Sequence, residues 1–113
     1  MYAFLANYQM NESRLIIMDE FGEQIAVRHV HLPLERLVAS LTSEMIDLSH
    51  HYNLYHEDIA AIGLAVNLDS IPYSTTDKLI EELEEAFHFK AIVDEELEST
   101  KQAVLAYMQE ENR

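Results

Sequence analysis

The chain has 113 residues, 49% of them hydrophobic and 25% charged, a composition that is typical of one soluble globular domain, and its two Gly and two Pro leave little room for linkers or low-complexity segments. Its formal charge of −14 at pH 7 opposes binding to nucleic-acid phosphates and to anionic membranes, because both require clustered cations. Cysteine is absent, and no apolar run approaches the roughly 18 residues that span a bilayer. We therefore expect a single cytoplasmic domain over residues 1–113, frayed at 109–113, that binds neither nucleic acid nor membrane.

The first part of the chain predicts three antiparallel strands. Residues 2–8 and 13–18 are short, apolar and rich in aromatic or branched side chains, as strands are. The letters DEFG that follow supply a hairpin turn, with Gly22 at the position where a positive φ is expected. Apolar residues then continue from Ile25 to about Leu32, which indicates a third strand.

A helix and a fourth strand follow. Pro33 fits the first turn of a helix that reaches about His51, because apolar residues recur there at intervals of three and four. Residues 59–66, IAAIGLAV, are almost wholly apolar. Such a run is typical of a central strand that is covered on both faces.

The remaining sequence predicts a helix, a strand and a last helix. Residues 74–77, STTD, offer helix caps before the amphipathic run at 78–87. Residues 89–93 indicate a fifth strand, and helical spacing returns at 96–108. The order βββαβαβα predicts an α/β domain with a mixed five-stranded sheet and three helices.

Three fragments at their spacing in this order, LIIMDEFGE, DIAAIGLAV and FKAIVDEE, resemble the first half of the actin-like ATPase superfamily, whose fold is ribonuclease-H-like. Within it, the chain is most similar to the ROK family of bacterial sugar kinases and sugar-responsive transcriptional repressors. The similarity extends from Tyr2 to about Tyr107 and is carried mainly by hydrophobic pattern. It implies that residues 1–113 form one ROK-like N-terminal domain.

The resemblance also identifies a degenerate phosphate loop. In such kinases the first strand ends in Asp followed by Gly-Gly-Thr, and the glycines let backbone N–H groups approach the phosphate. Counting back from Gly22 places Asn7 at the Asp position, Gln9 and Met10 at the glycines, and Asn11 at the Thr. These four residues are the ligand-binding candidates of the loop, and its phosphate chemistry is altered at each of them.

The family's catalytic Asn-Asp pair is not matched either. A gap-free count from the fifth strand places it on Glu95 and Glu96, whereas a shift puts Asp94 at the acid position. Glu96, or Asp94 if shifted, therefore occupies a degenerate catalytic-base position. The alternative interpretation is that these acids, with Glu98, form the acidic first turn of the last helix and favour its dipole.

Sugar-side candidates come from the same resemblance. The family has Pro-Gly after its fourth strand, and Asn67 and Leu68 stand there in this chain. We take Asn67, Asp69 and Glu96 as the residues nearest a sugar.

Two groups of histidines are candidate metal ligands. His29 and His31 lie two residues apart on an expected strand and share a face, but chelation needs a third ligand that the sequence does not identify. His50, His51 and His56 lie near the end of the first expected helix, where a cationic His complements the helix dipole. We expect no metal site.

The leading hypothesis is a non-catalytic ROK-like domain of a sugar-responsive transcriptional regulator, with a sugar or phosphosugar as ligand and no cofactor. One alternative is a pure homodimerisation or protein-interaction module. Another is half of a sugar kinase that needs a separate second domain, since ATP is closed between two such halves. A sheet without its partner half should expose apolar surface, so we also expect a homodimer. Operator binding would need a winged helix upstream of Met1.

Overall fold

The structure is a computed structural model that describes residues 1–67, 69 and 75–111. Short 3₁₀ turns at Leu34–Arg36 and His56–Asp58 precede the first helix and the fourth strand. The main elements of the described part are β1 (Tyr2–Asn7), β2 (Ser13–Asp19), β3 (Gln24–Val30), α1 (Leu37–His51), β4 (Ile59–Ala65), α2 (Thr76–Phe87), β5 (Lys90–Asp94) and α3 (Leu97–Glu111). The predicted order βββαβαβα is confirmed.

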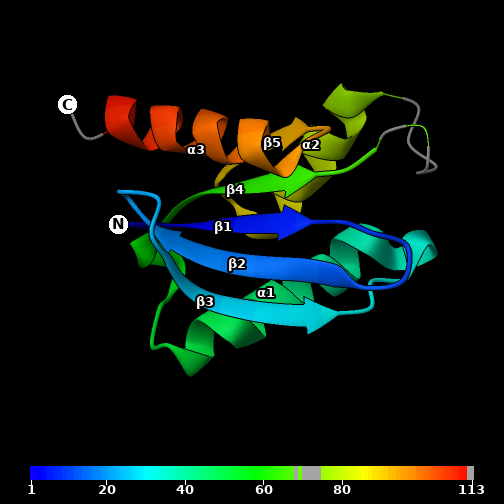
Figure 1. The fold of residues 1–113 in the computed structure, drawn as a ribbon, viewed down its shortest axis with the longest axis horizontal. Coiled ribbons are helices and arrows are strands. Elements are labelled where there is room, and N and C mark those ends of the chain that lie inside the picture. Colours follow the sequence, from blue (N-terminus) through cyan, green and yellow to red (C-terminus); the bar gives the residue numbers. More distant parts are fainter. Residues whose placement is uncertain (68, 70–74, 112–113) are drawn as a thin grey trace.

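The strands of the described residues form one five-stranded sheet in the order β3-β2-β1-β4-β5 (Figure 1). β2 pairs antiparallel with both β1 and β3. β4 pairs parallel with both β1 and β5, so the carboxyl ends of β1, β4 and β5 meet at one edge of the sheet. The predicted mixed sheet is therefore confirmed, and its carboxyl edge is where ligands of open α/β sheets bind.

Helices cover the two faces of the sheet unequally. Side chains alternate along β1, so that Phe4 lies in the core beneath α1 and α2, whereas Leu5 lies in a second core beneath α3. α3 packs on β4, β5 and β1, and Figure 1 shows it on the opposite side of the molecule from β3. The α3 face of β2 and β3 is thus left partly open.

Close packing beneath α3 explains one of the two glycines. A Cβ on Gly63 of β4 would lie 2.7 Å from Cγ2 of Val104 and 2.8 Å from Cγ2 of Thr100. Only a residue without a Cβ lets the helix approach the strand this closely. β4 is buried on both faces, as its apolar sequence predicted.

The β2–β3 hairpin turn explains the other glycine. Gly22 has φ +85°, which confirms the predicted positive value. The Asp19 carboxylate accepts the N–H groups of Phe21 and Glu23, both at 2.9 Å, and this closes the turn. A Cβ on Gly22 would lie 3.0 Å from Cδ1 of Leu105, so the turn also rests against α3.

Several predicted boundaries are corrected. β3 ends at Val30 because the chain then turns inward to bury Leu32, which is 1% exposed. α1 begins only after the 3₁₀ turn Leu34–Arg36, for which Pro33 is the N-cap residue, and the N–H of Arg36 donates to the Pro33 carbonyl at 3.1 Å. Thr75 caps α2 by accepting the N–H of Lys78 at 3.1 Å, whereas the other cap candidate, Ser74, lies outside the described residues.

The last helix is longer than its apolar pattern predicted. α3 continues beyond Met108 to Glu111, so residues 109–111 of the expected frayed tail are helical, and 112–113 lie outside the described residues. Met108 is fully buried, which anchors the final turns against the sheet. No helix in the described ranges has both the length and the apolar content needed to cross a membrane.

Candidate functional site

The candidate site lies at the carboxyl edge of the sheet, where β1, β4 and β5 end. The N–H of Tyr8 donates to the carbonyl of Ala65 at 2.9 Å, and the N–H of Val66 donates to that of Asp94 at 2.9 Å. These bonds keep the three parallel strands paired to their last residues. The loops that follow therefore start side by side.

The β1–β2 loop is closed by its own side chain. Ser13 is fully buried, and its hydroxyl accepts the Gln9 N–H at 3.1 Å and donates to the Gln9 carbonyl at 3.2 Å. Loops that hold phosphate direct successive backbone N–H groups toward the anion. In this loop the N–H groups of Tyr8 and Gln9 both bond within the protein, so neither is available to an anion.

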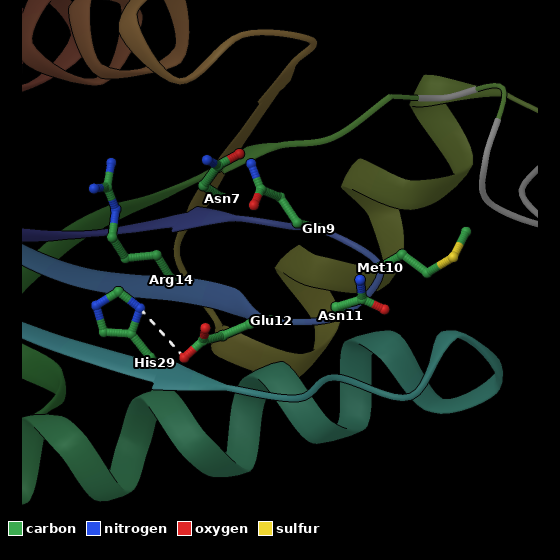
Figure 2. A pocket seen from close by; sticks show the side chains of 7 residues that line it. All are labelled: Asn7, Gln9, Met10, Asn11, Glu12, Arg14 and His29. Carbon is green, nitrogen blue, oxygen red and sulfur yellow. Dashed lines mark ion pairs between the residues drawn. The ribbon is translucent and has the colours of Figure 1, made fainter.

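Above this loop is a hollow of about 620 Å³ (Figure 2). All four loop candidates line it, so the structure brings the sequence-predicted loop residues together. Two further residues, Arg14 of β2 and His29 of β3, complete a row across the sheet, because Asn7 pairs with Arg14 and Arg14 with His29. The full lining is Asn7, Gln9, Met10, Asn11, Glu12, Arg14 and His29.

Arg14 is the distinctive group of this hollow. Its Nε is buried and has no hydrogen-bond partner among the described residues. The acid that lines the hollow, Glu12, makes no ion pair with Arg14; its Oε1 lies 3.6 Å from Nδ1 of His29, which forms an ion pair when His29 is protonated. Sequence reasoning missed Arg14, although a single cation on an otherwise apolar strand face was the available signal.

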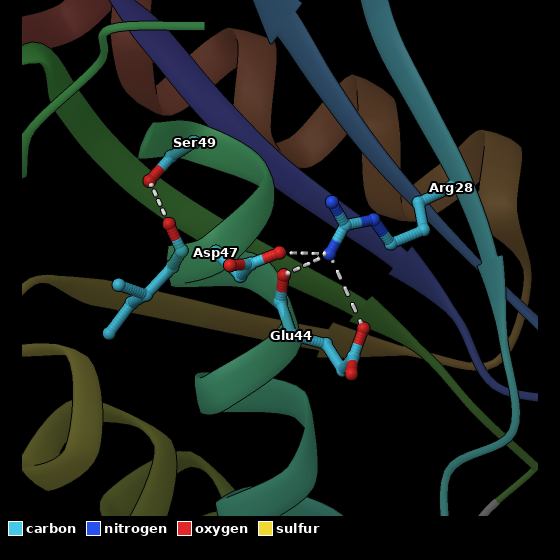
Figure 3. A network of polar contacts seen from close by, with 5 residues as sticks. Arg28, Glu44, Asp47 and Ser49 are labelled. Atoms are coloured by element: carbon cyan, nitrogen blue, oxygen red, sulfur yellow. Dashed lines mark hydrogen bonds and ion pairs between the residues drawn. The ribbon is translucent and has the colours of Figure 1, made fainter. Parts of the chain in front are cut away.

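A second arginine on the neighbouring strand shows the opposite behaviour (Figure 3). Nη1 of Arg28 lies 2.8 Å from Oδ2 of Asp47 and 3.4 Å from Oε2 of Glu44, both on α1. The hydrogen bond from Arg28 holds the pKa of Asp47 below its ordinary value, and the same bond raises the pKa of Arg28. Arg28 therefore ties β3 to α1, on the face of the sheet away from the hollow.

A second hollow of about 580 Å³ lies on the other side of the loop. Gln9 and Met10 line both hollows, whereas Asn67 and His31 line only this second one. His29 and His31 consequently do not share a site. In residues 1–67, 69 and 75–111, no group of three or more His, Asp and Glu side chains is placed to hold a metal ion.

The acidic candidates do not join the loop hollow. Asp94 is the last residue of β5, and its carboxylate accepts the Glu95 N–H at 2.7 Å. The Glu96 carbonyl accepts both the N–H and the hydroxyl of Thr100, while the Glu96 side chain is exposed. The expectation of a wholly acidic first turn is also wrong, because α3 begins after Glu96 and includes only Glu98 of the four acids in its first turn.

The sugar-side candidates are dispersed. Oδ1 of Asn67 accepts the N–H of Asp69 at 3.0 Å. Asn67 lines the second hollow and Glu96 lines neither of the two, while Leu68 lies outside the described residues. The structure therefore brings Asn67 beside Gln9 and Met10 of the loop, at the second hollow, but does not bring Glu96 there.

Comparison with known proteins is informative only at the level of structure. The chain matches no protein-family model and no curated protein sequence. It is similar to a ROK family glucokinase from Streptomyces griseus, solved with glucose and AMPPNP, with a TM-score of 0.65 and 15% identity over 82% of this chain and 32% of that one. A ROK family transcriptional regulator, a homologue of the E. coli MLC protein, gives 0.60 and 16% over 81% and 27%.

A protein of unknown function from Bacteroides thetaiotaomicron, described as having an actin-like ATPase fold, gives a TM-score of 0.58 and 11% identity over 93% of this chain and 37% of that one. The chain therefore has the actin-like ATPase fold that ROK proteins share, and the resemblance seen in the sequence is confirmed at the level of the fold. It spans well under half the length of each of these proteins. They include both a kinase and a regulator.

Proposed function

We propose that this chain is a non-catalytic ROK-like domain that senses a sugar as part of a transcriptional regulator. The observation that carries the proposal is the closed β1–β2 loop, in which buried Ser13 bonds both the N–H and the carbonyl of Gln9. A loop bonded to itself in this way does not offer those backbone groups to a nucleotide. The fold supplies the sugar class, since the similar proteins include a glucokinase solved with glucose and a ROK regulator.

Two further features support a role without phosphoryl transfer. Transfer needs preorganised groups that hold the nucleotide phosphates and their metal ion. Asn7 ends β1 with a neutral amide, which is a weaker metal ligand than a carboxylate. Glu96 is exposed and does not line the loop hollow, so it is not placed as a base beside Asn7.

The test is titration of the purified chain with ATP–Mg²⁺ and, separately, with glucose. We expect glucose to bind without nucleotide, and ATP–Mg²⁺ to give no binding heat at millimolar concentration. ATP-dependent phosphorylation of glucose, by the chain alone or with a separate second half, would overturn the proposal in favour of a kinase half.

A second candidate function, homodimerisation, is favoured by the open edge of β3. β3 ends the sheet order, and no described strand pairs with its outer edge. Ile25 and Val27 are each 36% exposed. The strand Gln24–Val30 contains no acidic residue in a chain of net charge −14, so a second copy that pairs there meets no repulsion between carboxylates of the two strands.

Solution mass tests this second function. A dimer formed through β3 should dissociate in Val27→Lys, because a lysine at a strand edge opposes pairing with another strand. Ile46→Lys, at a side chain of similar exposure on α1, is the matched control and should leave the mass unchanged. A wild-type chain that is monomeric at high micromolar concentration excludes homodimerisation.

A further inference from the structure

Arg14 is a cation that the fold leaves without an anion. Its Nε is buried and unpaired among the described residues, and the guanidinium makes no ion pair with any described acid. Leaving such a donor unsatisfied costs free energy, more for a charged group than for a neutral one. A half-buried arginine whose Nε is unpaired beside a hollow is therefore better explained by a ligand than by stability.

The two acids that line hollows with Arg14 contact other side chains and not its guanidinium. Glu12 lies in the same hollow and is directed to His29, at 3.6 Å. Glu98 of α3 borders Arg14 on the far side, in a groove of about 150 Å³, and its Oε1 accepts a hydrogen bond from Gln102 at 3.2 Å. Lys101 lines the same groove and adds a second positive charge. The balance of charge around Arg14 thus permits a bound anion in an otherwise acidic chain.

The neighbours of Arg14 suit hydroxyl groups. Figure 2 shows the side chains of Asn7 and Gln9 on the same side of the sheet as Arg14, while Met10 extends from the tip of the loop and is 77% exposed. Carboxamides both donate and accept hydrogen bonds, which is what a sugar hydroxyl requires. A volume of about 620 Å³ lies within the range of small-molecule sites.

We infer that the hollow binds a sugar that carries an oxyanion, with the anion on the Arg14 guanidinium and the hydroxyls on the carboxamides of Asn7, Gln9 and Asn11. The planar guanidinium donates two parallel hydrogen bonds to a phosphate or a carboxylate. The anion is thus held by a side chain from β2 and not by the backbone of the β1–β2 loop. The anion part of this inference stands on Arg14 alone, and the sugar part rests on the proposed sensing function.

Calorimetric titration of the whole chain with glucose 6-phosphate, glucuronate, inorganic phosphate and glucose tests the inference. We expect glucose 6-phosphate or glucuronate to bind more tightly than glucose, and the choice between the two identifies the oxyanion. Arg14→Met, which keeps an apolar stem of similar length, should weaken that binding by about tenfold or more, because hydrogen bonds to charged groups are lost. Arg36→Met, at an exposed arginine outside the hollow, should change nothing.

The outcomes separate the two proposals. Glucose that binds as tightly as the anionic sugars, with Arg14→Met unaffected, keeps sugar sensing and overturns the anion site. Inorganic phosphate that binds as tightly as glucose 6-phosphate, and only through Arg14, keeps the anion site and contradicts sugar sensing. If none of the four probes binds, both proposals are wrong.

A folding control keeps the test decisive. Circular dichroism establishes that Arg14→Met is folded before it is titrated. Arg14→Lys then provides a second variant that retains the charge and loses the planar fork, so it should bind with intermediate affinity. Two results together would contradict an ionic contact at this position: Arg14→Lys binds the anionic sugar as weakly as Arg14→Met does, and both variants still bind inorganic phosphate.

Discussion

The two halves of one sheet face behave differently in this molecule. Under α3, β4 and β1 are packed so closely that Gly63 has no room for a Cβ. Beyond α3, the same face carries a hollow at Arg14 and His29 and the exposed side chain of Val27. The position of α3 therefore determines which half of the face builds the core and which half is open to ligands or partners.

The largest expected loss of stability comes from a substitution in the half of the sheet face that α3 covers. Leu5 is 2% exposed beneath α3, so Leu5→Ala should lower the free energy of unfolding by about 2–5 kcal/mol through lost burial and a cavity. Val27→Ala, on the open half, should cost less than about 1 kcal/mol. Urea unfolding of both variants measures the contrast, and equal losses would show that α3 does not divide the face.

Overpacking should be the next largest effect. Gly63→Ala should cost about 1–3 kcal/mol, because the new methyl group meets Val104 and Thr100 below normal contact distance. Adding Val104→Ala removes one of the two clashes, so the double variant should lose less than the sum of the single losses. Strictly additive losses in denaturant titrations would argue against the close approach of α3 to β4.

Substitution of Arg14, on the open half of the face, and of Arg28, on the reverse face of the sheet, should change the free energy of unfolding in opposite directions. Arg14→Met removes an unpaired buried donor and should leave the free energy of unfolding unchanged or raise it by about 1 kcal/mol. Arg28→Met removes the tie between β3 and α1 and should lower stability. Thermal melts of both variants test this, and a clear loss on Arg14→Met would mean that Arg14 has a structural partner.

The smallest effect is a pH dependence on the reverse face. Arg28 holds the pKa of Asp47 below its ordinary value, so this carboxyl contributes stability that is present above its unfolded pKa and is lost as the pH falls through its folded pKa. Asp47→Asn should therefore melt slightly below the wild type at neutral pH, and the two should converge on acidification below about pH 4. Glu85→Gln, at an exposed acid of α2, is the control and should melt with the wild type at every pH.

Much of the fold could be read from local pattern. The apolar run of β4, the hairpin glycine and the amphipathic helices each carry their signal within a few neighbouring residues, and all are confirmed. The errors lie at boundaries that depend on tertiary contacts. Leu32 turns inward and ends β3 early, and burial of Met108 prolongs α3 beyond its apolar pattern.

The candidate site was only half predictable for a related reason. The resemblance identified residues 7–11 as one loop, and the structure places this loop at a hollow. Arg14 and His29 join it through pairing across three strands, a relation that no local pattern contains. The resemblance made Glu96 a degenerate catalytic-base position and a sugar-side candidate, but its side chain is exposed and lines neither of the hollows beside the loop.

The most direct test of the account is the ¹H–¹⁵N spectrum of the chain during titration with glucose 6-phosphate. We predict shifts concentrated on the open half, at the side-chain amides of Asn7 and Asn11 and at Nε of Arg14, with little change at Gly63 beneath α3. Shifts confined to the second hollow, at Asn67 and His31, or a spectrum that responds to ATP–Mg²⁺ and not to the sugar phosphate, would contradict it.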